Sequence, residues 1–361
     1  MKTVISNYQA ALILIFTLVA TAIVFLPSLI INQARQDAWI SIILLIIIFI
    51  FISLIYNALA NRMGRIDLIN FTRKVFGNIL TIPIGITIIL GFIILSGTVV
   101  RETSEVMLTA YMPLTPLWFF NITIILASSY IVFHGLEVIG RSVEILFYIF
   151  LFFFLIFILL LIPEMSFEFI QPLLGQGIRP IWDGMYPGLV FFGELFIILI
   201  LAPHLTQKGQ AFKPLLIALI IGGGLFLIVI FSILMLFGPA FANELKIPLI
   251  TAFGYIQQFR IIERLDSLFI FMWIGGGVLK NAIFIYVIVY TVQKLFNLST
   301  YHIFIPLVIP SVFYISFYFF PNTAELTDFL YQRIPYFMGL QILYPVLLLA
   351  VSWLRGINCN E

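Results

Sequence analysis

Two ionisable side chains lie deep inside long apolar stretches of the sequence and are the first candidates for chemistry. Glu194 follows the apolar residues 186–193, and Lys280 follows the three glycines at 275–277. A charged group at such a depth in a membrane span costs at least about 2.5 kcal/mol, so it indicates a functional role by default. Two other interpretations stay open: a protonated structural Glu194, or a Glu194–Lys280 ion pair that only orders the packing.

A third candidate is the middle of the first apolar stretch, which has two threonines among small residues, Thr17, Ala20, Thr21 and Ala22. If the helix unwinds there, the freed backbone N–H and C=O groups can bind the carboxylate and the ammonium of a zwitterion. The alternative is a helix whose threonines bond to their own backbone and whose alanines pack against a neighbour.

Helical spacing predicts the direction in which Lys280 points. Gly276, Lys280 and Phe284 share one helix face at i, i+4 spacing, and the glycines allow another helix to approach closely. Lys280 is therefore expected to point into the helix bundle, where it can pair with Glu194 or supply a fixed positive charge in place of a bound cation.

Three charged residues stand near the end of a helix that is predicted to extend from 79 to 111. Arg101 and Glu105 have the i, i+4 spacing of a helical ion pair. Together with Glu102 they favour a solvated vestibule over direct contact with a substrate. Thr98, one turn deeper, is a better candidate to line a pocket.

The composition predicts the elements that carry these residues. Of 361 residues, 63% are hydrophobic and 9% are charged, whereas a soluble domain has about 25% charged residues. The apolar runs are about twenty residues long and do not alternate, which predicts transmembrane helices rather than barrel strands. We expect an all-α membrane protein that forms a single integral membrane domain over 1–361. Its ten spans are predicted at 8–31, 38–59, 79–111, 117–134, 142–163, 185–203, 214–238, 265–294, 303–320 and 335–354.

Several classes of function are disfavoured. The net charge of +2 without a basic run argues against a nucleic-acid partner. No glycine-rich phosphate loop with lysine, HExxH or GxSxG motif is present, and the single Cys359 cannot form an intrachain disulfide or a cysteine metal cluster. We therefore expect no enzyme activity, catalytic residue, metal or cofactor.

The basic residues of the loops predict the orientation. If the N-terminus is inside, the cytoplasmic loops hold Lys2, Arg62, Arg65, Arg73, Lys74, Arg141, Lys208, Lys213, Lys294 and Arg355. The opposite loops hold Arg35, Arg179, Lys246, Arg260, Arg264 and Arg333. Because Lys and Arg are enriched in cytoplasmic loops, both termini are expected in the cytoplasm.

Short motifs carry a family resemblance. Residues 20–23 with Pro27 resemble the Gly-x-Gly-Ile…Pro signature, and residues 192–194 resemble the Gly-Phe-Glu/Asp signature, of the amino acid–polyamine–organocation transporter superfamily. A narrower resemblance is to the spore germination permease family, the membrane B subunits of nutrient-germinant receptors. It extends over the chain through QDAWIS at 36–41, HGLEVIGR at 134–141 and ERLDSLFIFMW at 263–273.

The resemblance implies a leucine-transporter-like fold, a 5+5 inverted repeat in which helices 1 and 6 are discontinuous. In that superfamily the substrate carboxylate meets the glycine turn of span 1, and spans 3, 6 and 8 enclose the rest. Carried over position by position, the implied ligand-binding residues are Ala20, Thr21, Ala22, Ile23, Thr98, Phe191, Gly193, Glu194, Lys280, Asn281 and Phe284. Both signature glycines of span 1 are alanines here, which narrows the space for a carboxylate.

The implied function is nutrient sensing. The resemblance predicts a multi-pass protein of the spore inner-membrane lipid bilayer that binds a small nutrient, typically an amino acid, in a midplane pocket. It implies an A subunit and a lipoprotein C subunit as partners that carry the signal to germination. Two alternatives stay open: a proton-coupled secondary amino acid transporter, and a membrane scaffold with a vestigial pocket.

Overall fold

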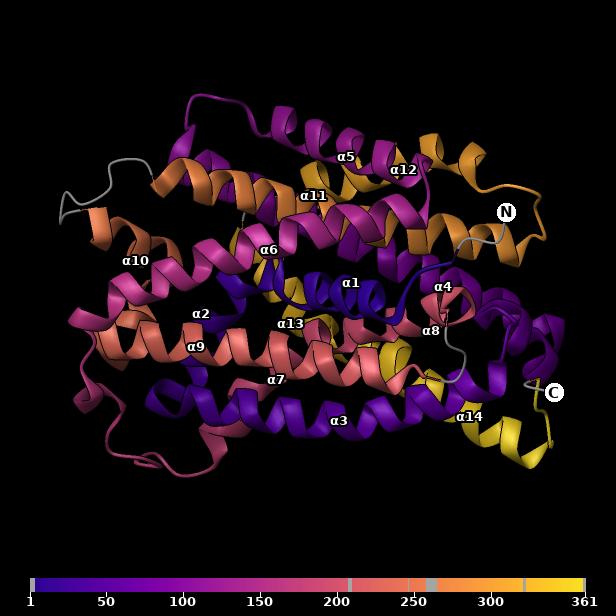
Figure 1. Cartoon of the computed structure of the whole chain (residues 1–361), viewed down its shortest axis with the longest axis horizontal. Coiled ribbons are helices and arrows are strands. Elements are labelled where there is room, and N and C mark those ends of the chain that lie inside the picture. Colours follow the sequence, from indigo (N-terminus) through magenta and orange to yellow (C-terminus); the bar gives the residue numbers. More distant parts are fainter. Residues whose placement is uncertain (1–3, 207–209, 246, 258–264, 321–322, 360–361) are drawn as a thin grey trace.

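The structure is a computed structural model that describes residues 4–206, 210–245, 247–257, 265–320 and 323–359. All regular elements of these residues are helical, and the long helices lie side by side along one axis (Figure 1). The first and the last described residues lie at the same end of the bundle. Some residues used above lie outside the described part, namely Lys2, Lys208, Lys246, Arg260, Glu263 and Arg264.

Within the part of the chain that the structure describes, the helices form ten spans, as predicted. Span 1 is α1 (Asn7–Val19) and α2 (Ala22–Ala34), span 2 is α3 (Ala38–Met63), span 3 is α4 (Leu68–Val106) with η2 (Met107–Tyr111), span 4 is α5 (Leu117–Phe133) and span 5 is α6 (Leu136–Leu161). Span 6 is α7 (Arg179–Gly193), η5 (Glu194–Ile197) and α8 (Ile198–Leu201), span 7 is α9 (Phe212–Glu244), span 8 is α11 (Leu265–Leu295), span 9 is α12 (Ile305–Tyr314) with η8 (Ile315–Phe319), and span 10 is α13 (Thr323–Met338), η9 (Gly339–Leu343) and α14 (Tyr344–Leu354).

Length and composition agree with a membrane-spanning bundle. Within the described residues, eight helical runs are long and apolar enough to cross a membrane, and α1 and α5 are shorter apolar helices. The run Ala22–Met63 contains the second half of span 1 and the whole of span 2, and the chain changes direction within it at Arg35, whose φ is 52°. The chain is therefore a multi-pass membrane protein.

Spans 1 and 6 are interrupted near their middles. Helix α1 ends at Val19 and α2 begins at Ala22, while span 6 narrows to the 3₁₀ turn η5. The backbone stays in the helical region at Ala20 (φ −48°, ψ −55°) and at Thr21 (φ −98°, ψ −32°), so the interruption in span 1 is smaller than the unwound turn considered from the sequence. Thr17 follows the alternative interpretation, because its hydroxyl donates to the Ile13 carbonyl at 2.8 Å.

The predicted connection 60–78 is partly helical. Helix α4 already begins at Leu68, where the Asp67 side chain accepts from the backbone N–H of Asn70 at 3.0 Å and caps the helix. The helix bends at Gly77, whose φ of 81° favours glycine. This bend lies at the predicted start of span 3, so the charged residues before it form a separate helical segment.

The other two long connections also contain short helices. Helix α9 bends at Gly238 (φ 69°), and α10 (Pro248–Gln257) follows it. In the connection 164–184, Phe167 and Trp182 are exposed whereas Ile181 is buried. Phe167 lies on η4 (Phe167–Ile170), and Trp182 lies in the first turn of α7.

Three glycines bring α11 against its neighbours in the bundle. A Cβ atom added at Gly277 would lie 2.3 Å from the hydroxyl oxygen of Thr103 on α4, and one at Gly276 would lie 3.5 Å from the Cβ of Ala20. The indole N–H of Trp273 donates to the Thr103 carbonyl at 3.1 Å. The predicted close approach is confirmed, and it places Lys280 on α11 between spans 1, 3 and 6.

Candidate functional site

The polar centre of the bundle is an ion pair between spans 8 and 6. Lys280 Nζ lies 2.8 Å from Glu194 Oε2, and the two side chains are 0% and 2% exposed. The ammonium also lies 5.6 Å from the ring centre of Phe191 and 5.5 Å from that of Phe284, which is the range of cation–π attraction. The expected inward direction of Lys280 is confirmed, and of the two alternatives considered for its charge the structure shows the pair with Glu194.

A second carboxylate lies beside this pair. Glu102 on α4 is only 5% exposed, interacts electrostatically with Lys280 and lies next to the Thr21 hydroxyl. Its Oε2 atom is buried within the bundle. The prediction that Glu102 belongs to a solvated vestibule was wrong, because the packing of α11 against α4 encloses it.

These buried charges form the deep end of a cavity of about 760 Å³. Thr98, Phe191, Glu194 and Lys280 line it, as does Glu102. At its other end the lining residues are exposed, and they come from η2, from the end of α9 and from α13, namely Thr109, Glu244 and Asp328. The cavity therefore extends from the bundle end opposite the termini down to the ion pair.

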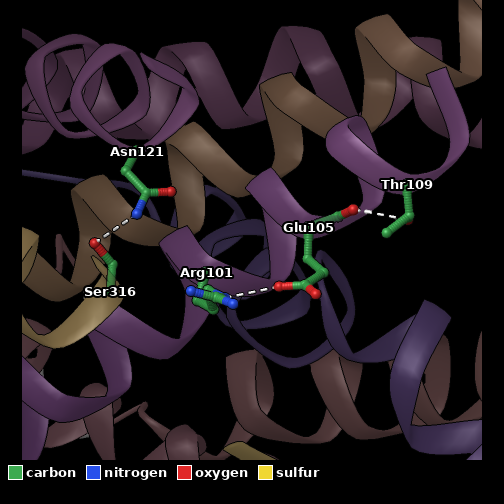
Figure 2. A network of polar contacts seen from close by, with 5 residues as sticks. All are labelled: Arg101, Glu105, Thr109, Asn121 and Ser316. Carbon is green, nitrogen blue, oxygen red and sulfur yellow. Dashed lines mark hydrogen bonds and ion pairs between the residues drawn. The ribbon is translucent and has the colours of Figure 1, made fainter. Parts of the chain in front are cut away.

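A helical ion pair supports one wall of the cavity (Figure 2). Arg101 Nε lies 2.7 Å from Glu105 Oε2, which confirms the i, i+4 pairing predicted from the sequence. The Thr109 hydroxyl donates to the Glu105 carbonyl at 2.7 Å. On the far side of α4, Asn121 Nδ2 donates to the Ser316 hydroxyl at 3.1 Å and ties span 4 to span 9.

The predicted ligand-binding residues separate into two groups. Thr98, Phe191, Glu194 and Lys280 line the cavity of about 760 Å³, which is called the acidic cavity below because five carboxylates line it. Ala20 and Ile23 instead line a second, apolar cavity between spans 1, 5 and 8, with Trp273.

The other predicted residues are buried behind these two cavities. Asn281 Oδ1 accepts a hydrogen bond from the Ser96 hydroxyl. The Phe284 ring packs edge-on against the Phe92 ring, with 5.4 Å between the two ring centroids. A Cβ added at Gly193 would lie 2.2 Å from Gln341 Oε1, while Thr21 and Ala22 are fully buried. Their ligand-binding role stays a prediction.

Sequence reasoning missed Glu102 as a cavity residue, although a signal for it was present. Thr98, Glu102 and Glu105 are spaced i, i+4 and i+7, which places them on one helix face. Among the described residues no group of three or more His, Cys, Asp or Glu side chains could hold a metal ion.

Comparison with known protein families identifies the relatives of this chain. A family model described as "Spore germination protein" matches residues 4–324. Spore germination protein XB of Bacillus anthracis is 26% identical over 287 residues, which is 79% of each chain. Spore germination protein KB of Bacillus subtilis (strain 168) is 23% identical over 300 residues, 82% of this chain and 80% of its own length.

Solved transporters share the fold. A nucleobase-cation-symport-1 family transporter in a closed conformation superposes with a TM-score of 0.77 at 11% identity, covering 98% of this chain and 79% of its own. MhsT in complex with L-phenylalanine gives a TM-score of 0.63 at 14% identity, covering 99% and 90%. At these identities the likeness concerns the fold alone, and it confirms the predicted leucine-transporter-like arrangement with discontinuous spans 1 and 6.

Proposed function

Since this chain belongs to the spore germination protein family, we propose that it is the membrane subunit of a nutrient-germinant receptor and that it binds a small nutrient in the acidic cavity. In this proposal the protein lies in the spore inner membrane. An A subunit and a lipoprotein C subunit are its partners, and they convert the bound state into the germination signal.

The observation that carries the proposal is the Lys280–Glu194 ion pair at the deep end of the 760 Å³ cavity. Burying such a pair costs desolvation energy that an apolar pair of equal volume would not, so its retention needs a reason. Polar groups that converge at the end of a largely apolar pocket are typical of small-molecule sites. A ligand that reaches this pair is shielded from water, and its charges interact strongly with the pair.

The same geometry supports a sensing mechanism. The deep wall of the cavity combines α4, α7 with η5, and α11, which belong to spans 3, 6 and 8. A ligand that contacts these elements better in one arrangement than in another shifts the equilibrium between the two. Partner subunits that contact the moving spans then respond to the ligand without touching it.

The loop charges orient the cavity in this proposal. With both termini in the cytoplasm, as the basic residues of the loops indicate, the exposed cavity residues Thr109, Glu244 and Asp328 face the outer side of the membrane. Nutrients that diffuse into a spore arrive from that side.

A second candidate function is proton-coupled amino acid transport. Glu102 and Glu194 are two buried carboxylates beside one ammonium, and either could take up a coupling proton. The shared fold is that of transporters, which keeps this candidate open.

Two measurements on purified protein test the proposal. In proteoliposomes with an imposed pH gradient, a receptor should show no concentrative amino acid uptake, and robust uptake would favour the transporter. In detergent, a nutrient that binds the folded state should raise the unfolding temperature, and Lys280→Met should abolish the shift while Glu137→Gln on the exposed start of α6 keeps it. No shift with any nutrient in the presence of the partner subunits would support the scaffold alternative instead.

A further inference from the structure

We propose that the ligand of the acidic cavity is an organic cation, a compound with an ammonium group and a net positive charge, rather than a neutral zwitterion. This inference rests on the proposed function of the cavity as a nutrient site and adds the chemical class of the nutrient.

The first argument is the charge of the lining. Five carboxylates line the cavity, those of Glu102, Glu105, Glu194, Glu244 and Asp328, whereas Lys280 is the one lining cation among the described residues. Arg101 compensates Glu105 from within α4. A cleft lined by one sign of charge concentrates ligands of the opposite sign, so the cavity attracts cations and repels anions.

The second argument is the state of the deep charges. The single positive charge of Lys280 faces two carboxylates, because it pairs with Glu194 at 2.8 Å and also interacts electrostatically with Glu102, so the deep end carries more negative than positive groups. Glu102 lines the cavity with its buried carboxylate, and its neighbours are the neutral Thr21 hydroxyl and the Lys280 ammonium that Glu194 already neutralises. An ammonium donor placed there would form a charge-assisted hydrogen bond, which makes Glu102 the anchor.

The third argument is the position of span 1. The carboxylate of a zwitterion would need backbone donors from the turn at Ala20 and Thr21, yet Ala20 and Ile23 line the apolar cavity. Span 1 contributes to the acidic cavity only from Phe25 onward. At the turn, the Thr21 hydroxyl lies beside the carboxylate of Glu102, a neighbour that repels a ligand carboxylate.

The fourth argument concerns the size and the aromatic part of the lining. Phe25, Phe191 and Tyr331 line the cavity, and aromatic rings attract cations. The cavity volume of about 760 Å³ is far larger than the volume of an inorganic ion, and the described residues contain no cluster of three metal-ligating side chains. These features favour an organic cation over an inorganic one.

A length-matched series of ligands tests the inference on the full chain in lipid nanodiscs at constant ionic strength. Cadaverine, L-lysine, L-norleucine and hexanoate differ mainly in charge, and binding is measured by calorimetry. We expect cadaverine and L-lysine to bind at least about tenfold more tightly than L-norleucine, with hexanoate weakest. Glu102→Gln should weaken cadaverine binding about tenfold or more, whereas the matched variant Glu137→Gln should leave it unchanged.

Each other outcome has a defined meaning. If L-norleucine binds as tightly as L-lysine to the wild-type protein, the inference that the ligand carries a net positive charge is wrong, while the cavity remains a nutrient site. This comparison uses only the wild-type protein, so it tests the inference even if Glu102→Gln does not fold. If NaCl or KCl at equal concentration displaces cadaverine, the ligand of the cavity is an inorganic cation and the organic-cation inference is wrong. Binding of no member of the series would overturn this inference, whereas the proposed function fails only if no nutrient shifts the unfolding temperature in the presence of the partner subunits.

Discussion

Lys280 holds the centre of the bundle together at the scale of single residues. Its ammonium is fully buried, pairs with Glu194 and lies between the rings of Phe191 and Phe284, with Glu102 nearby. Every one of these contacts depends on its charge. Removing the charge leaves two carboxylates that must take up protons or remain uncompensated in a site shielded from water.

This arrangement predicts a non-additive loss of stability. Lys280→Met should lower the free energy of unfolding by about 3 kcal/mol, because breaking a buried pair leaves an uncompensated charge. The double variant Glu194→Gln with Lys280→Met should be more stable than Lys280→Met alone, since the main unpaired carboxylate is gone. Denaturant titration in mixed micelles measures both changes.

If the double variant loses as much free energy of unfolding as Lys280→Met and Glu194→Gln lose together when measured singly, this account of the pair is contradicted. Glu137→Gln is the control for carboxylate removal as such, because Glu137 is exposed at the start of α6.

The sequence was sufficient to find Glu194 and Lys280 but not Glu102. A single charge within a long apolar run is visible from composition alone, because hydrophobicity is a local property. Glu102 stands among polar neighbours that resemble a solvated helix end. Its burial depends on how α11 packs against α4, and that is a tertiary contact which no local pattern contains.

At the scale of elements, the glycines of α11 set the distance between spans 8 and 3. Gly277 faces the Thr103 side chain so closely that an added methyl group has no room. The same contact region carries the hydrogen bond from Trp273 to the Thr103 carbonyl. The position of Lys280 relative to Glu102 therefore depends on this helix contact.

Gly277→Ala should destabilise the protein by about 1–3 kcal/mol through overpacking, and it should also weaken ligand binding because α11 moves away from α4. Gly224→Ala on α9 is the matched control, since an added Cβ there meets no atom within 4 Å. Thermal unfolding and ligand titration of both variants measure the two effects. If the two variants have the same unfolding temperature and the same ligand affinity, the α4–α11 contact does not determine the geometry of the site.

Most elements could be predicted from the sequence, and the differences have physical causes. Apolar runs predicted the spans, the irregular middle of span 1 was expected from its small residues, and the family resemblance implied the discontinuity of span 6. The helical segment before Gly77 was missed because charged residues outside the membrane can also form helix. The turn at Ala20 stays in the helical region, as alanine prefers, where glycine would allow a wider unwinding.

At the scale of the whole molecule, the cavity opens at the end opposite the termini, which the proposal places outside. In a Cys359→Ser background, an impermeant thiol reagent added outside should modify Thr109→Cys at the cavity entrance and leave Ser299→Cys unmodified. Both positions are exposed in the structure and lie at opposite ends of the bundle. The reverse labelling pattern would invert the proposed orientation.

The central claim is that a nutrient triggers germination by binding beside the buried ion pair. The most direct test compares the germination of spores that carry wild-type protein, Glu194→Gln or Glu137→Gln at equal receptor levels over a range of nutrient concentrations. Our account predicts that Glu194→Gln raises the concentration for half-maximal response about tenfold or more, while Glu137→Gln does not change it. Wild-type response of the Glu194→Gln spores at normal protein levels would contradict the claim.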